Sequence, residues 1–205
     1  MSSVAAVPVR KPGSAVPMHG VRLGEVGWAD MHWLASIKRE RLERPLYVVT
    51  TGMDQVDDWL VELLALADLC RPHPTAPHSP GGPITYPRWG DEYWVGGLDQ
   101  ETGGQTKRYV VVSHDFHNAV PARPVIVRTT SQPKRNALEF PAIEDGSCHA
   151  CCGDVRSHPS EDFDLRRRPT PDALSIDDMR RVAYGLASVL DLENAVVRAG
   201  GTFEA

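Results

Sequence analysis

A proline-rich stretch divides the chain into two parts. The stretch RPHPTAPHSPGGPITYP, from Arg71 to Pro87, contains six prolines and two glycines. Proline has a fixed φ and no backbone N–H, so such a run cannot form the interior of a helix or a strand. We therefore predict a linker over residues 71–86, between an N-terminal part and a C-terminal domain.

The N-terminal part contains two kinds of segment. Residues 1–20 are small and Pro-rich, which predicts a disordered arm. Residues 21–70 form an extension that contains the run DQVDDWLVELLALADL. Its apolar residues recur at helical spacing, so the extension is predicted to be partly helical, with one amphipathic helix.

The C-terminal part, residues 87–200, has the pattern of an α+β domain. The runs EYWVGG, RYVVVS and PVIVRTTS are short, β-branched or aromatic, and NALEFPAI is a possible fourth strand. Near the end, Ser175 is placed to cap a helix, with Asp178 at the capping-box position. Strands followed by one terminal helix predict a small antiparallel barrel or sandwich closed by a C-terminal helix.

Charge and hydropathy exclude several classes of function. The 205 residues carry a net charge of −5, so nucleic acid would have to be held by a local basic patch. No apolar run reaches the roughly 18 residues that span a bilayer. We therefore expect a cytoplasmic protein without a membrane partner.

The four cysteines raise the question of a metal. Cys148, Cys151 and Cys152 include a C-x-x-C pair, and His149 and His158 lie nearby. A second pair at zinc-binding spacing is missing, although Cys70 and His73 could complete a site across the linker. We predict free thiols, no metal and no cofactor.

The stretch VIVRTTSQ, residues 125–132, begins like a core strand and ends in hydrogen-bonding groups. In a strand, Ile126, Arg128 and Thr130 share one face, and Val125, Val127 and Thr129 share the other. An arginine fork and a short hydroxyl donor are groups that bind phosphate well. The strand end is thus a candidate phosphate site; a hydroxyl that only completes a turn is the alternative.

The order of these pieces resembles the MazF/PemK toxin family, of the CcdB/MazF-like type, over about residues 86–192. The matching segments are PRWGDEYWVGGLDQETGGQTKRYVVVSHDFHN, PVIVRTTSQ, CGDVRSHPSEDFD and LSIDDMRRVAYGLASVLDL. The resemblance implies an SH3-like barrel, a homodimer and metal-independent, sequence-selective cleavage of single-stranded RNA such as mRNA. It also implies a toxin–antitoxin system, with a cognate antitoxin protein as partner.

The resemblance implies a catalytic threonine and a catalytic arginine. The threonine corresponds to Thr130. The Arg-Pro of the family reads Lys107-Arg108 here, so alignment favours Lys107 and chemistry favours Arg108, whose guanidinium can bind a phosphate through two hydrogen bonds. Both are retained as candidate catalytic residues.

Candidate RNA-binding residues surround this pair. An imidazole can exchange a proton near neutral pH, a basic run can contact phosphates and an aromatic ring can stack on a base. The candidates are Arg128, Ser131, His114, Arg166 and Arg167. Alternation places one of Tyr93 and Trp94 in the core, and Trp89 is the ring expected to be more exposed.

Two other functions fit the same fold. The departure at Lys107-Arg108 favours a catalytically inactive MazF-fold protein that binds a protein or RNA partner. A gyrase poison like the related CcdB toxins would leave RNA intact. The N-terminal extension is atypical of such toxins, and an extension that covered the RNA groove would act as a built-in inhibitor.

Overall fold

The computed structural model describes most of the chain. The described residues are 3–6, 8–11, 13–15, 20–23, 25, 27–31, 35–38, 52–72, 85–95, 107–119, 123–132, 136–163 and 173–203. The predicted linker lies mostly outside these ranges. None of the described helices is long and apolar enough to cross a membrane.

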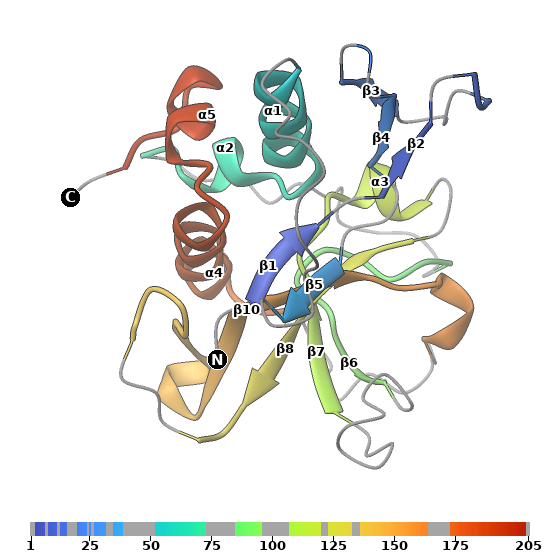
Figure 1. Cartoon of the computed structure of the whole chain (residues 1–205). Coiled ribbons are helices and arrows are strands. Elements are labelled where there is room, and N and C mark those ends of the chain that lie inside the picture. The colour runs from blue at the N-terminus through green and yellow to red at the C-terminus, as the bar shows by residue number, and fades with distance from the viewer. Residues whose placement is uncertain are drawn as a thin grey trace.

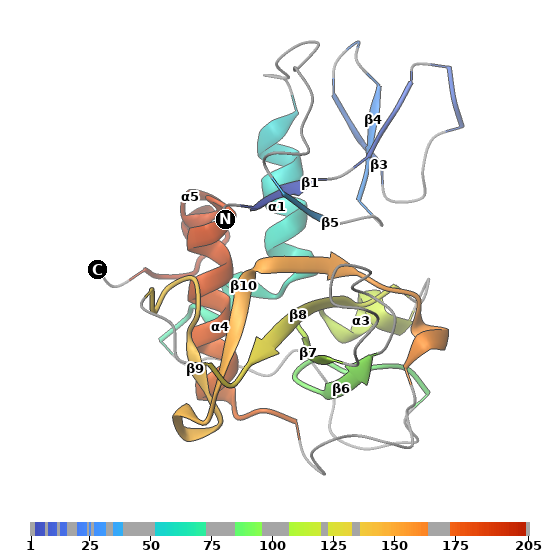
Figure 2. The ribbon, with the colours of Figure 1, turned by 60° about the horizontal axis from the view of Figure 1, so that its bottom comes forward.

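A twisted five-stranded sheet forms the centre of the molecule (Figures 1 and 2). Neighbouring strands of this sheet pair antiparallel. In spatial order its strands are β6 (Glu92–Val95), β7 (Lys107–Val111), β8 (Val125–Thr130), β10 (Cys148–Ser157) and β9 (Ala142–Ile143). The predicted α+β fold, with an antiparallel sheet and a C-terminal helix, is confirmed.

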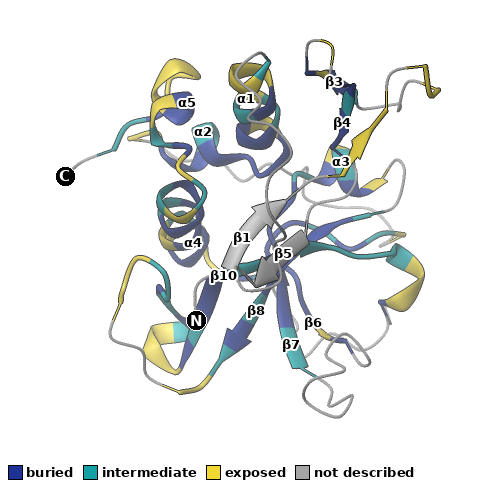
Figure 3. Cartoon of the chain, in the orientation of Figure 1, coloured by how far each residue is buried: buried dark blue, intermediate teal, exposed yellow. Residues whose placement is uncertain are grey.

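Strand alternation gives this sheet two different apolar faces. Val110, Val127 and Val155 point to the large core, which also contains the helices. Side chains of the opposite parity form a smaller cluster that consists of Tyr93, Val95, Tyr109, Val111, Ile126 and Phe163. We refer to these as the helix face and the open face of the sheet. Most strand residues of the sheet are buried (Figure 3).

The helices pack on one side of the sheet. They are α1 (Met53–Leu63), α2 (Leu66–Leu69), α4 (Ile176–Val189) and α5 (Glu193–Arg198), and the short α3 (Asp115–Ala119) follows β7. The amphipathic helix predicted in the extension is present, but it breaks at Ala65, where φ is 51°. The predicted cap of α4 is confirmed, because Oγ of Ser175 accepts a hydrogen bond from the Asp178 N–H at 3.1 Å.

The N-terminal part also contains short strands. Strands β2 (Val9–Arg10), β4 (Trp28–Asp30) and β3 (Gly20–Arg22) form a three-stranded sheet, and β1 (Ser3–Ala6) pairs with β5 (Ala35–Lys38) beside β10. Strands β1 and β2 lie within residues 1–20, and their backbones pair with later strands.

The extension and the C-terminal part share one hydrophobic core. The large cluster joins Met31 of the N-terminal part and Leu66 of α2 to Val127 of β8 and Leu186 of α4. Backbone hydrogen bonds cross between the parts as well, from His114 N–H to the Leu63 carbonyl at 2.8 Å, for example. The extension is thus part of the folded body.

The segment Arg88–Asp91, which carries part of the family resemblance, is a buried turn. Gly90 has a φ of +77°, a conformation that favours glycine, and its N–H donates to the Val111 carbonyl at 2.8 Å. A carboxylate oxygen of Asp91 accepts from the Arg88 N–H at 3.1 Å. Trp89 is only 1% exposed, so its expected exposure is wrong. The turn docks β6 against β7.

Candidate functional site

Thr130 lies at the end of β8, on the open face of the sheet. In the pairing of β8 with β10, His149 is directly opposite Thr130. On the other side, the register of β7 with β8 pairs Tyr109 with Arg128, and its continuation places Lys107 opposite Thr130. Residues paired in this way have side chains on the same face. Lys107, Thr130 and His149 therefore form a row across three strands, all of them half-buried.

The hydroxyl of Thr130 already takes part in a turn. Its Oγ1 accepts a hydrogen bond from the Gln132 N–H at 3.2 Å. This agrees with the alternative hypothesis for Thr130, in which the hydroxyl completes a turn. A threonine hydroxyl has one proton to donate as well as lone pairs to accept. The turn uses a lone pair, so it fixes the oxygen while leaving the proton available for a ligand.

Arg128 is on the same face, two residues before Thr130. Its Nε lies 3.1 Å from a carboxylate oxygen of Asp154, which also pairs with Arg156. Asp154 comes from the part of β10 where the register with β8 shifts between Ala150 and Val155. Two arginines on one carboxylate leave this part of the face with a net positive charge.

Arg108 points to the opposite face, because side chains alternate along β7. Its guanidinium makes two hydrogen bonds to the Glu144 carboxylate, at 3.0 and 2.7 Å, and lies 3.4 Å from the fully buried carboxylate of Glu92. Its Nε also donates to Oγ1 of Thr129 at 3.3 Å. Of the two candidate cations, the structure places Lys107 with Thr130, and Arg108 on the other side of the sheet.

The Arg108–Glu144 pair shifts the pKa of both groups. Burial alone would raise the pKa of Glu144, but hydrogen bonds and charge from Arg108 outweigh it and lower that pKa. Burial would lower the pKa of Arg108, but its bonds to Glu144 and the charge of Glu92 raise it. Both groups therefore stay charged, as expected of a structural ion pair.

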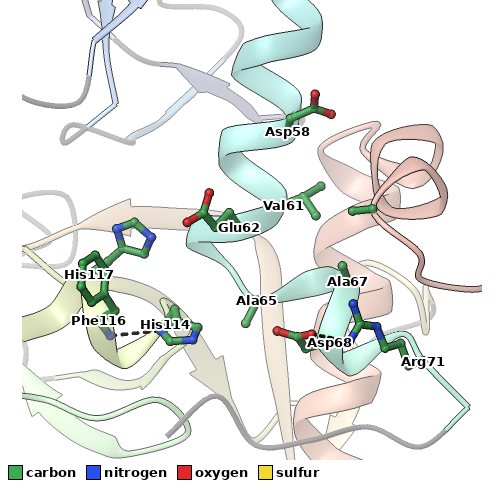
Figure 4. A pocket seen from close by; sticks show the side chains of 11 residues that line it. Asp58, Val61, Glu62, Ala65, Ala67, Asp68, Arg71, His114, Phe116 and His117 are labelled. Atoms are coloured by element: carbon green, nitrogen blue, oxygen red, sulfur yellow. Dashed lines mark hydrogen bonds and ion pairs between the residues drawn. The ribbon is translucent and has the colours of Figure 1, made fainter.

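His114 lies far along the sheet from Thr130. It follows the C-terminal end of β7, whereas Lys107 begins that strand. Its Nδ1 accepts from the Phe116 N–H at 3.0 Å (Figure 4). It lines a hollow of about 520 Å³ between α1, α2 and α3, together with His117, Phe116, Glu62 and Asp68. The hollow is lined by carboxylates, unlike the row around Thr130.

The remaining predicted residues are placed as follows. Ser131 is exposed, directly after Thr130. Arg166 and Arg167 lie outside the described residues. Tyr93 is buried and Trp94 is 55% exposed, so the prediction that one of them enters the core is confirmed. The pairing of Trp94 with Arg108 places this exposed ring at the helix face.

The four cysteines are free and buried. Within the described part of the chain, no three side chains of the metal-ligating types come close enough to hold an ion. Burial raises the pKa of the Cys70 thiol to about 12. Cys148 donates its thiol to the carbonyl of Thr130 at 3.4 Å, and Cys152 to that of Val182 at 3.7 Å. These thiols are parts of the packing.

His149 and Asp154 belong to this face but were not predicted as members of the site. His149 was considered only as part of a possible zinc site, beside three cysteines. The segment CHACCGDVRS does not alternate between polar and apolar residues, because its strand contains the register shift. The D-V-R segment shared with the family is the one sequence signal for this strand.

No protein-family model matches the sequence, and no curated protein matches it. Solved structures are similar to about half of the chain. An endoribonuclease from Mycobacterial species, in complex with its cognate antitoxin, is 18% identical, and the match covers 51% of this chain and 95% of that one, with a TM-score of 0.44. A MazE–MazF complex from Deinococcus radiodurans is 22% identical, with 51% and 96% covered and a TM-score of 0.41.

MazF of Deinococcus radiodurans by itself is also similar. It is 22% identical, with 52% of this chain and 97% of that chain covered and a TM-score of 0.39. These neighbours include proteins of the family that the sequence motifs resemble. Such a likeness concerns part of the backbone path, and the chemistry of the site rests on the side chains described above.

Proposed function

We propose that this chain is a MazF-like endoribonuclease of a toxin–antitoxin system, which cleaves single-stranded RNA without a metal and with sequence selectivity. The observation that supports it most directly is the β7–β8 register, which pairs Tyr109 with Arg128 and, when continued, sets Lys107 opposite Thr130. A positive charge and a hydroxyl donor on one side of a sheet suit a bridging phosphate of RNA.

Cleavage of an RNA strand passes through a phosphorane-like state with extra negative charge on its oxygens. Donors that are held in place before the reaction stabilise that charge without having to reorganise. Thr130 is held by its turn and Lys107 by β7. We assign Thr130 the hydrogen bond to a nonbridging oxygen and Lys107 the neutralisation of its charge.

The surrounding face supplies the groups for binding the rest of the strand. Arg128 and Ser131 lie on either side of Thr130 along the chain, and both are proposed to contact neighbouring phosphates or sugars. Arg166 and Arg167 stay proposals from the sequence. Since the whole chain carries a net charge of −5, we expect binding through a local patch that weakens as salt is added.

The test uses a mixed-sequence RNA incubated with the protein in EDTA. We expect cuts at a restricted set of sequences, with 2′,3′-cyclic phosphate ends. Thr130→Val removes the hydroxyl at nearly constant volume and should reduce cleavage by about a hundredfold or more. Thr130→Ser retains the hydroxyl and serves as the matched control. A folded protein that leaves every RNA intact would contradict the enzymatic proposal.

A second function is favoured by the ion pairs of the two arginines. Arg108 is bound to Glu144 and Arg128 to Asp154, and a lysine cannot replace the two parallel hydrogen bonds of an arginine. A protein with the same face could therefore bind RNA or a protein partner without cutting. Tight binding of RNA with no cleavage, unaffected by Thr130→Val, would identify this second function.

The family resemblance also implies a cognate antitoxin and a homodimer. We propose both, and light scattering of the purified chain, alone and with the product of a neighbouring small reading frame, tests them. A monomer at micromolar concentration would exclude the stable homodimer. Failure to form a complex with the neighbouring product would exclude that product as the antitoxin.

A further inference from the structure

We propose that His149 accepts the proton of the attacking 2′-hydroxyl in the reaction proposed above. This inference rests on the proposed function and adds a named proton acceptor to it. The juxtaposition that supports it is the direct pairing of His149 on β10 with Thr130 on β8.

The position of His149 is fixed by the backbone of two strands. Directly opposite residues of an antiparallel pair have Cβ atoms about 4.5–5.5 Å apart and project to the same side. The neighbour of His149 on its other side, in β9, is Ala142. His149 is thus flanked by a small side chain on one side and, on the other, by Thr130, whose hydroxyl would bind the phosphate.

The hydrogen bonding of the imidazole is incomplete. Nδ1 of His149 is shielded from solvent, and among the described residues it meets no hydrogen-bond partner. Buried polar atoms in folded proteins are nearly always paired, so an exception requires a reason. Because Nδ1 is shielded, a ligand at this row would meet the ring at its other nitrogen, Nε2, which is the atom that we propose takes the proton.

The other polar side chains on the open face near Thr130 are poor proton acceptors. Lysine and arginine are protonated near neutral pH, and a threonine hydroxyl is a weak base. Asp154 is a carboxylate, but Arg128 and Arg156 both engage it. Histidine is the side chain that exchanges a proton between pH 5 and 8. His149 therefore has the chemistry that the row otherwise lacks.

The proposed step balances as follows. Neutral His149 takes the proton of the 2′-hydroxyl while the 2′-oxygen forms a bond to phosphorus. The bond between phosphorus and the 5′-oxygen breaks, and the leaving oxygen takes a proton from solvent. The imidazolium then returns its proton to solvent. The products are a 2′,3′-cyclic phosphate and a 5′-hydroxyl, with no change of oxidation state.

The charged groups near His149 come from three strands. Arg128 lies on the neighbouring strand β8 and Lys107 one strand further away on β7, while Asp154 and Arg156 lie further along β10. A base must be neutral to act, so cleavage should increase with pH over the range in which histidine exchanges a proton.

The experiment compares His149→Gln and His149→Ala with the wild-type chain in EDTA, across a range of pH. We expect both variants to lose about 10² to 10⁴ of kcat/KM, to bind RNA as before, and to lose the acidic limb of the pH profile. Added imidazole should partly restore cleavage by His149→Ala, since the removed ring leaves space. His117→Gln is the control for loss of a histidine away from the site, because His117 lies on α3 and contacts Trp59.

The outcomes separate this inference from the proposed function. If the wild type cuts RNA and His149→Gln cuts it equally well with the same pH profile, His149 is not the proton acceptor and the enzymatic proposal stands. If the wild type does not cut, both fail. If a variant does not fold by circular dichroism, imidazole rescue of the other variant decides, and rescue to no more than the background rate overturns the inference.

Discussion

Lys107 and Arg108 are adjacent in the chain, and the pleat of β7 sends their side chains to opposite faces of the sheet. Lys107 lies in the half-buried row with Thr130. Arg108 is enclosed by Glu144, Glu92 and Thr129, with an 18% exposed side chain. The sequence left open which of these two cations belongs to the site. Because they lie on opposite faces, we expect their removal to have different effects.

We predict that Arg108→Ala lowers the free energy of unfolding by about 2–3 kcal/mol, because it leaves two carboxylates without their shared cation. Lys107→Ala should change it by less than about 0.5 kcal/mol, as expected of a partly exposed surface charge. Urea unfolding followed by circular dichroism measures both values.

Among the folded variants, we expect cleavage to depend more on Lys107 than on Arg108, which is the reverse of the order expected for stability. Lys107→Ala is expected to lower kcat/KM by about a hundredfold, whereas Lys107→Arg should retain much more cleavage, because it keeps the positive charge and the N–H donors. Equal losses of stability in Lys107→Ala and Arg108→Ala would show that the two side chains do not occupy different faces.

Acid should destabilise the protein in two stages. Burial lowers the pKa of His158 below 6.5, helped by Arg123 and Arg156 and opposed by Asp162. The pKa of Glu144 is lowered below 4.5. In both cases the unfolded chain binds the proton more readily, so the stabilisation is complete above the unfolded pKa and is lost as pH falls through the folded pKa.

Melting temperatures measured in steps of pH test this prediction. The first loss should begin below about pH 6.5 and disappear in His158→Gln, which has no imidazole to protonate. The second should begin below about pH 4.5 and persist in that variant. A melting temperature that stays constant from pH 7 to 5 would contradict the assignment to His158.

At the scale of the elements, what could be predicted from the sequence depended on how regular each segment is. Helix α4 was identified because its cap and its apolar stripe agree. Strand β8 was identified because all its residues except Arg128 are β-branched. The zinc alternative at Cys148–Cys152 arose because a C-x-x-C spacing is visible in sequence, whereas burial of each thiol in β10 is not.

The pairing of His149 with Thr130 could not be predicted in the same way. It depends on the register between β8 and β10, and that register shifts between Ala150 and Val155. A strand with such a shift presents no simple period of two. Likewise, the face of the sheet to which Arg108 points depends on the register of β7. A shift of one residue would move each side chain of the strand to the opposite face.

Helix α4 lies close to the rest of the chain at Gly185. A Cβ atom at this position would lie 2.5 Å from the carbonyl oxygen of Leu138 and 2.8 Å from Sγ of Cys152. In an exposed helix, Gly→Ala stabilises by about 1 kcal/mol. Here the added methyl group has no space, since the nearest atom belongs to the backbone.

We therefore predict that Gly185→Ala lowers the free energy of unfolding by about 1–3 kcal/mol, through a forced shift of α4 away from β10. Thermal and urea unfolding both measure the effect. Val189→Ala, at a more exposed position on the same helix, is the control and should have a smaller effect. A more stable Gly185→Ala would show that the helix has room to move.

At the scale of the whole molecule, the extension is necessary for the core. Five leucines of α1, α2 and their junction are buried: Leu60, Leu63, Leu64, Leu66 and Leu69. At about 2 kcal/mol each, they contribute about 10 kcal/mol, which is comparable to the net stability of a typical domain. We therefore expect the extension to be part of the folding unit, which argues against a removable inhibitor.

We predict that a chain beginning at residue 85 does not fold. It should show no cooperative unfolding transition and should aggregate, because the side of α4 and α5 that contacts α1 and α2 would be exposed. A chain that lacks only residues 1–7 is the control and should retain a cooperative transition. A folded, soluble chain from residue 85 would show that the C-terminal part has a sufficient core of its own.

The buried cysteines can be used to detect local opening of the folded structure. Cys70 lies where the helices meet, Cys148 and Cys151 lie in β10, and Cys152 lies between β10 and α4. A thiol-reactive dye should therefore label the native protein slowly and all four cysteines after denaturation. The order in which the positions become reactive in mild urea would show which contact opens first: that between the helices or that between α4 and the sheet.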